Sequence, residues 1–345
     1  MLRVVQVGVG GYGAWWLPTV LGAAGRAEYA ALVDVDEAAL AAARQQTGLS
    51  ERQCFQTLDA ALNSVQADAV LCVVPPAHHE AVIVPALEAG LHVLSEKPIA
   101  DTLAATHRIV AAARRARGRL MIAQKGRYHP WVRRFRAALA GGAIGRLNFL
   151  TLHYRAPLFR WGASGFRHRM ADPLLVEMSI HHFDLLRALL GRDAVDVAGR
   201  SWNWAWSGFA GDVAASLVIT MDGDLPVVYE ANCISAGDLT SWYGEIRAEG
   251  ETGTLTMIYP RLYIARRGAD QIHTAGLRED LMAVTDAHAG QAVAFGEFLD
   301  AVEQDRPAET SAEDNLRTMA LLFAAVDACH TGERRRVAGY LSPPA

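Results

Sequence analysis

Glu177 and His181 lie four residues apart in a stretch whose apolar spacing predicts a helix, and their side chains suit proton transfer. Residues with this spacing share one face of a helix, so a carboxylate and an imidazole would be neighbours there. Imidazole titrates near neutral pH and can accept the proton that a hydroxyl group loses when a carbinol is oxidised. The carboxylate would orient the ring and stabilise its protonated form. The pair predicts a general base, His181, supported by Glu177; the alternative is an ordinary contact on a helix surface.

The surroundings of this pair leave a second carboxylate to consider and argue against a metal. Asp172, just before Pro173 at the start of the predicted helix, is a competing candidate for the carboxylate. Only Glu177 and His181 have the spacing of metal ligands, and the local pattern supplies no third ligand, so we expect no metal. His182 lies off the face of Glu177, which predicts a packing role.

A glycine-rich loop follows the first short apolar run, residues 4–7, and matches the pattern G-x-G-x-x-G. In such a loop the glycines allow a tight turn, close approach of a pyrophosphate and packing of a helix against a strand. Asp34 ends the next strand pattern, where a carboxylate would accept hydrogen bonds from a ribose diol and repel a 2′-phosphate. We therefore expect a dinucleotide, NAD in preference to NADP, although NADP stays an alternative. The residues that would hold it here are Gly8, Gly10, Gly11, Tyr12, Gly13 and Asp34.

Two further strand patterns, residues 69–74 and 92–95, end in chemically distinctive loops. Folds that alternate strands and helices bind their ligands at the carboxyl ends of the strands. The residues of these loops that we expect beside the cofactor are Val74, Pro75, His79, Glu96 and Lys97. An amine near a positively charged nicotinamide ring gives up its proton more readily, so Lys97 could relay a substrate proton. A surface lysine paired with Glu96 is the plainer interpretation.

The order of these motifs resembles that of the glucose–fructose oxidoreductase, inositol dehydrogenase and MocA (Gfo/Idh/MocA) family. The resemblance covers nearly the whole chain and rests on Gly8 to Gly13, Pro75 with His79, Glu96-Lys97-Pro98, Arg127 with Pro130, Gly142 to Gly145, His181 with Asp184, and Ser311 to Asn315. The family's helix motif commonly reads D-x-G-x-H-x-x-D, so His181 and Asp184 match it, whereas Glu177 and Ser179 replace its Asp and Gly. The resemblance implies hydride transfer between a nicotinamide and a sugar, cyclitol or related polyol.

The same resemblance leaves two other functions open. One is a redox-neutral enzyme with tightly bound NAD, of the glycosidase or aldose–aldose oxidoreductase type. The other is a non-catalytic sugar-sensing protein, against which the presence of Lys97 and His181 argues. The family's substrate pocket borders the Arg-rich and aromatic region before the helix, so Trp161, Arg169 and Asp172 are our candidate substrate residues. A solvated basic loop is the alternative interpretation of that region.

The elements that must position these residues follow from hydrophobic periodicity. Up to residue 123, apolar runs alternate with amphipathic stretches, which predicts a doubly wound parallel sheet of the Rossmann type. Asp36 is the expected N-cap of the second helix. We expect a dinucleotide-binding domain at 1–123, followed at 124–345 by an α+β domain with a large open-faced mixed sheet for substrate binding and oligomerisation. Its expected elements are helices at 130–139, 174–190, 288–303 and 312–330, and strands at 146–154 and between 195 and 264.

Composition excludes several other classes of function. The chain has 345 residues, 51% of them apolar and 20% charged, as expected for a globular protein of two domains. A formal net charge of −4 without a basic cluster argues against nucleic acid as a partner. The four scattered cysteines form no C-x-x-C pair, which favours reduced thiols and a cytoplasmic location. The sequence predicts no signal peptide and no membrane span.

Three tryptophans, Trp202, Trp204 and Trp206, alternate in a predicted strand and would therefore face one side of a sheet. A row of exposed indoles is more typical of a subunit interface than of a monomer's surface. Because the family's open-faced sheet often pairs subunits, we expect a homodimer or homotetramer. Stacking of the indoles on a sugar ring is the alternative.

Overall fold

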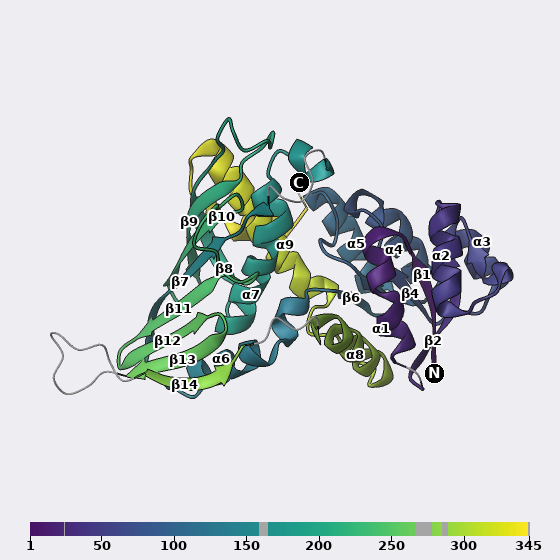
Figure 1. Ribbon diagram of the computed structural model, residues 1–345, viewed down its shortest axis with the longest axis horizontal. Coiled ribbons are helices and arrows are strands. Elements are labelled where there is room, and N and C mark those ends of the chain that lie inside the picture. The colour runs from purple at the N-terminus through teal and green to yellow at the C-terminus, as the bar shows by residue number, and fades with distance from the viewer. Residues whose placement is uncertain (24, 159–164, 267–277, 285–288, 344–345) are drawn as a thin grey trace. The chain divides into compact units, whose positions relative to one another are not determined.

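The computed structural model describes residues 1–23, 25–158, 165–266, 278–284 and 289–343 (Figure 1). Contacts along the chain divide it into two compact units. The first comprises Met1–Lys125 with His288–Met319, and the second comprises Gly126–Ala287 with Ala320–Ala345.

The first unit contains a six-stranded parallel sheet in the order β3-β2-β1-β4-β5-β6. Its strands are β1 (Leu2–Val7), β2 (Ala27–Val33), β3 (Cys54–Phe55), β4 (Ala69–Cys72), β5 (His92–Ser95) and β6 (Leu120–Ile122). The helices are α1 (Leu17–Leu21), α2 (Glu37–Thr47), α3 (Leu58–Ser64), α4 (His79–Glu88), α5 (Leu103–Arg115) and α8 (Ala289–Glu303). Strands β4 and β6 are buried throughout, as expected for a sheet covered on both faces. The strand order reverses between β1 and β4, which is where doubly wound folds bind ligands.

Two features of this unit bear on the sequence analysis. The carboxylate of Asp36 accepts hydrogen bonds from the amides of Ala38 and Ala39, which confirms it as the N-cap of α2. Helix α8 groups with the first unit, whereas the sequence division assigned everything after residue 123 to the second domain. The apolar periodicity of a helix does not reveal which sheet the helix covers.

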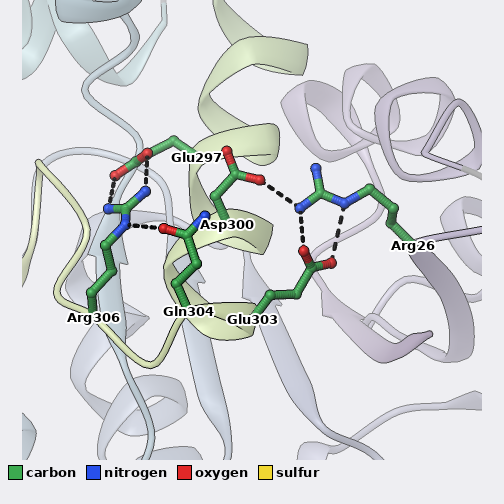
Figure 2. A network of polar contacts seen from close by, with 6 residues as sticks. All are labelled: Arg26, Glu297, Asp300, Glu303, Gln304 and Arg306. Carbon is green, nitrogen blue, oxygen red and sulfur yellow. Dashed lines mark hydrogen bonds and ion pairs between the residues drawn. The ribbon is translucent and has the colours of Figure 1, made fainter.

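Arg26, just before β2, pairs with two carboxylates of α8 (Figure 2). Its Nη2 lies 2.6 Å from Asp300 Oδ1 and 2.9 Å from Glu303 Oε2, and about half of each side chain is exposed. Water screens such pairs, so we expect a small contribution to stability.

The second unit is built on a nine-stranded sheet in the order β14-β13-β12-β11-β7-β10-β9-β8-β15, antiparallel except between β7 and β10. The strands are β7 (Leu147–Arg155), β8 (Ala194–Trp202), β9 (Ala214–Met221), β10 (Leu225–Asn232), β11 (Glu245–Gly250), β12 (Gly253–Ile258), β13 (Arg261–Arg266), β14 (Arg278–Ala283) and β15 (Arg335–Arg336). The helices are α6 (Pro130–Ala140), α7 (Ile180–Leu190) and α9 (Ala312–Thr331), whose first residues belong to the first unit. Burial alternates along β9 and β10, so one face of the sheet is packed and the other is open. Helices α6 and α7 lie along one face of this sheet (Figure 1). The predicted fold class is confirmed.

Of the three tryptophans, Trp202 lies in a strand and Trp204 and Trp206 do not, contrary to the prediction. Strand β8 ends at Trp202, because the Asn203 side chain accepts a hydrogen bond from the Trp204 amide and donates one to Phe209 O, each 2.8 Å long. The three indoles still form a cluster, which begins at the last residue of β8. The ring centroids of Trp202 and Trp204 are 6.4 Å apart, and those of Trp204 and Trp206 are 5.8 Å apart.

A buried ion pair joins Arg127 to Asp184 on α7. The Arg127 Nε and Nη2 atoms lie 2.7 Å and 2.6 Å from the two carboxylate oxygens, and the side chains are 5% and 2% exposed. This bidentate geometry satisfies both charges away from water. Removal of either partner would break a buried ion pair, which is strongly destabilising.

We expect Arg127→Met to lower the free energy of unfolding by about 3–5 kcal/mol, because the buried Asp184 carboxyl would lose its ion-pair partner. The exposed pair gives a matched control: Arg26→Ala should cost about 1 kcal/mol or less. Denaturant unfolding measures both. Arg127→Met combined with Asp184→Leu should recover much of the loss. A cost for Arg127→Met no larger than that for Arg26→Ala would contradict the expected contribution of the buried pair.

Candidate active site

The glycine loop follows β1 and is shaped by close backbone contacts. Gly8 has φ +87°, and a Cβ added there would lie 2.5 Å from Val73 O. A Cβ at Gly13 would lie 2.2 Å from Gly8 O, so no larger residue fits at either position. The buried Gln6 side chain braces the turn, since its Nε2 donates to Gly8 O at 3.0 Å and to Gly13 O at 2.8 Å. Tyr29 in turn donates to Gln6 Oε1 at 2.6 Å.

Asp34 ties the glycine loop to the end of β2. Its Oδ2 accepts hydrogen bonds from the amides of Val9 at 2.8 Å and Gly10 at 3.1 Å, while Oδ1 accepts one from the Asp36 amide at 3.0 Å. A carboxylate oxygen can accept two hydrogen bonds, so Oδ1 keeps room for a ribose hydroxyl. A Cβ added at Gly11 would meet no atom within 4 Å, so the loop is open to a ligand at that point. These residues fit a dinucleotide.

His79, Val74 and Pro75 are placed at the carboxyl ends of the strands, as predicted, but His79 is wholly buried. Its Nε2 lies 2.9 Å from Val74 O and its Nδ1 lies 2.9 Å from Pro98 O. Burial lowers the pKa of His79, so the ring is neutral and donates through one nitrogen at a time. His79 therefore holds the loops after β4 and β5 together, and Val74 and Pro75 lie in the loop that follows β4.

Glu96 organises the residues around it, and Lys125 is its cation. The Oε1 atom of this buried carboxylate accepts hydrogen bonds from Trp16 Nε1 at 2.9 Å and Lys125 Nζ at 3.0 Å, and Oε2 accepts one from the Lys97 amide at 3.2 Å. Lys125 also donates to the Tyr12 hydroxyl at 2.6 Å and lies 4.8 Å from the centre of that ring. Burial alone would lower the pKa of Lys125, but the charge of Glu96 and the contacts with Tyr12 outweigh it and raise that pKa. Lys125 is therefore an ammonium at neutral pH.

The sequence analysis missed Lys125, although a signal was present. The residue follows β6, whose carboxyl end lies beside that of β5 in the sheet. The argument that placed Lys97 at a strand end applies equally to Lys125.

In the second unit, the predicted helix at 174–190 is two elements. Leu174–Ser179 is a π-helical turn and α7 begins at Ile180. Glu177 therefore lies in the π turn and His181 in the first turn of α7. Arg167 lies beside Glu177: its Nε and Nη2 are each 3.3 Å from Glu177 Oε2.

His181 is partly exposed in the first turn of α7, and its ring centroid lies 5.8 Å from that of Trp242. The adjacent His182 is fully buried, with Nδ1 2.8 Å from the Tyr229 hydroxyl and Nε2 3.1 Å from Trp242 O. Burial lowers the pKa of His182 to about 4, so this ring is neutral near pH 7. Of the two histidines, His181 has the exposure that proton transfer to a substrate requires.

The candidate substrate residues, Asp172, Arg169 and Trp161, differ in their burial and in whether the structure describes them. Asp172 is buried, with Oδ1 2.8 Å from His330 Nε2 on α9. Arg169 is exposed at the end of a 3₁₀ turn, Phe166–Arg169. Trp161 lies outside the described residues. In the part of the chain that the structure describes, no three His, Cys, Asp or Glu side chains are grouped to hold a metal, and no helix there has the length and apolarity to cross a membrane.

Comparison with known proteins identifies the family. Residues 2–124 match the family model described as "Oxidoreductase family, NAD-binding Rossmann fold", and residues 132–256 match that of the GFO/IDH/MocA C-terminal domain. The chain is 30% identical over 347 residues to a Sinorhizobium fredii protein described as uncharacterized protein y4oX, covering 98% of this chain and 96% of that one. It is 27% identical to D-apiose dehydrogenase of Paraburkholderia graminis, covering 86% and 80%.

The fold is also that of solved structures. An oxidoreductase from Agrobacterium radiobacter, crystallised with NAD⁺, L-tartaric acid and magnesium, superposes with a TM-score of 0.87 at 19% identity, covering 98% of this chain and 99% of that one. The chain belongs to the Gfo/Idh/MocA oxidoreductase family, as the motifs predicted, and its first unit is an NAD-binding Rossmann domain. The prediction of an NAD-dependent oxidoreductase is confirmed.

We expect Lys125→Met to weaken NADH binding about tenfold, because Glu96 would lose its cation and Tyr12 its donor, which loosens the glycine loop. Isothermal titration calorimetry with NADH measures the affinity of each variant. Glu96→Gln together with Lys125→Met should recover part of the affinity, since neither charge remains buried alone. Arg117→Met, which removes an exposed cation of the same unit, is the matched control. NADH affinity equal in the Lys125 and Arg117 variants would show that Lys125 does not position the loop.

Proposed function

We propose that this chain is a dehydrogenase or reductase that transfers a hydride between NAD and a carbinol carbon of a sugar, cyclitol or related polyol. The observation that carries the proposal is the arrangement around Glu96, which fixes the Lys97 backbone and the glycine loop in one unit. The name of the relative D-apiose dehydrogenase supports a sugar as the substrate class. The four free thiols of Cys54, Cys72, Cys233 and Cys329 support a cytoplasmic location.

In the oxidative direction, the substrate hydroxyl loses a proton as the hydride leaves carbon for the nicotinamide. We propose that His181 is the base that accepts this proton. His181 is partly exposed, and its neighbour His182 is neutral near pH 7. Lys97 is the second proton-transfer group, and the bond from its amide to Glu96 fixes the start of its side chain. Glu177, beside Arg167, is a positioning residue for the α7 end of the site.

The proposal is tested by supplying the purified protein with polyols, aldoses and uronic acids together with NAD or NADP, and following the absorbance of the reduced cofactor. Reduction of free NAD by a sugar or polyol is the expected result. Co-purified NAD that is never released, while one sugar is oxidised as another is reduced, would instead establish the redox-neutral alternative. Failure of both reactions with every compound would reject the proposal.

We expect Lys97→Ala and His181→Ala each to lower kcat by about 100-fold or more, while NADH affinity changes little. Glu177→Gln should cost less and move the acid limb of the pH–rate profile to lower pH. Loss of a negative charge, and exposure of the Arg167 charge that it balanced, both disfavour the protonated form of His181. Rate profiles on any accepted substrate measure these effects. Turnover near the wild-type rate in His181→Ala would place the base elsewhere.

We also propose that the chain forms a homodimer or homotetramer through the open face of the nine-stranded sheet. Val218, Val228, Thr151 and Arg247 lie in one row across this face, since each is paired with the next in neighbouring strands. The row continues from apolar to charged, a mixture suited to a self-complementary interface. The exposed indole of Trp206 lies beyond the end of β8 in the same unit.

Light scattering at micromolar concentration should therefore give the mass of a dimer or tetramer. Val218→Glu should shift the population toward monomer, because a carboxylate would be buried at the interface without a partner. Val293→Glu is the control, since Val293 is equally exposed (46% against 45%) but lies on α8 of the first unit. A monomeric wild-type protein contradicts the proposal.

A further inference from the structure

The loop between β10 and β11 carries an exposed indole beside the proposed base. Trp242 is 39% exposed, and its ring meets that of His181 nearly edge-on, with 5.8 Å between centroids and 63° between planes. Both residues belong to the second unit. Tryptophan combines a large apolar surface with a polar N–H group, so its position beside the proposed base makes it available to a ligand that reaches His181.

The loop around Trp242 is held from both sides. The buried His182 ring lies 3.1 Å from Trp242 O, and the Tyr243 hydroxyl lies 2.6 Å from His129 Nε2. Gly244 follows with φ +78°, and a Cβ there would lie 2.7 Å from His153 O, so the turn that ends the loop is also constrained. The indole is therefore attached to a fixed backbone.

The contact between His182 and the loop of Trp242 also stays unchanged near neutral pH. With a pKa lowered to about 4 by burial, His182 stays neutral and its contact with the loop does not change as His181 gains or loses a proton. Trp242 thus offers a preorganised apolar surface next to a titratable group. Small-molecule sites typically combine such a surface with a few well-placed polar groups.

We propose that Trp242 is the substrate platform of this enzyme and selects ring-shaped polyols. The indole face would pack against the C–H face of a pyranose or cyclitol while one ring hydroxyl meets His181. A ring whose hydroxyl groups point outward presents its C–H bonds together on a flat face, whereas an open-chain polyol presents no such face and loses more conformational entropy when bound. The inference rests on the proposed function, because it takes His181 as the group that meets the substrate hydroxyl.

The test is the binding of myo-inositol and of D-sorbitol, a ring and an open chain with the same number of hydroxyl groups, to the protein saturated with NADH. Calorimetry should show tighter binding of myo-inositol. We expect Trp242→Leu to weaken the binding of myo-inositol about tenfold and to change the binding of D-sorbitol little. Trp242→Phe should retain most of the affinity for myo-inositol. Leu239→Ala, which removes another exposed apolar side chain of the same loop, should behave as wild type.

Further outcomes separate this inference from the proposed function. His181→Ala should lower kcat by about 100-fold or more but keep the preference for binding myo-inositol, since Trp242 remains. If myo-inositol binding depends on Trp242 but the protein oxidises no polyol, the proposed function is overturned and the role of Trp242 in binding is supported. The platform is overturned by an unchanged affinity in Trp242→Leu, by an equal loss for both ligands, or by a wild-type protein that does not bind myo-inositol. Thermal unfolding of the variants confirms that each is folded.

Discussion

A carboxylate in the interior must be neutralised and fully hydrogen-bonded, and Glu96 is the residue on which this requirement acts in the first unit. Moving an ion out of water costs several kcal/mol even after relaxation. Lys125, Trp16 and the Lys97 amide together satisfy the two carboxylate oxygens. These groups come from segments that are far apart in the chain, so satisfying one charge brings the glycine-loop helix, the loop of Lys97 and the end of β6 into a single arrangement.

In the second unit, buried polar groups likewise hold the backbone in place, while the side chains beside them are partly exposed. Arg127 with Asp184, and His182 with Tyr229, are buried and hydrogen-bonded, and they hold α7 and the loop before β11. The side chains left partly exposed next to them are His181 and Trp242. The buried pairs therefore fix the positions of α7 and the loop, while the side chains of His181 and Trp242 are available to a ligand.

Asp34 shows how one side chain can serve both purposes. Its carboxylate holds the amides of the glycine loop and the start of α2, which is a structural role that exists before any cofactor binds. The remaining acceptor capacity of Oδ1 is what a ribose hydroxyl requires. The negative charge that orders the loop is also a charge that would repel the 2′-phosphate of NADP.

The sequence alone determined the features that depend on residues close together in the chain. The glycine turn at Gly8, the cap at Asp36 and the alternation of strands and helices follow from local conformation and periodicity, and the packing role of His182 follows from its place on a helix face. Lys125 and Trp242 escaped this reasoning, because their partners lie 29 and 60 residues away and become neighbours only when strands pair and loops close. The contact of Glu177 with Arg167 and the grouping of α8 with the first unit likewise depend on contacts between segments that are separate in the sequence. Local preference decides the elements, whereas burial of charge and packing between distant segments decide which side chains meet.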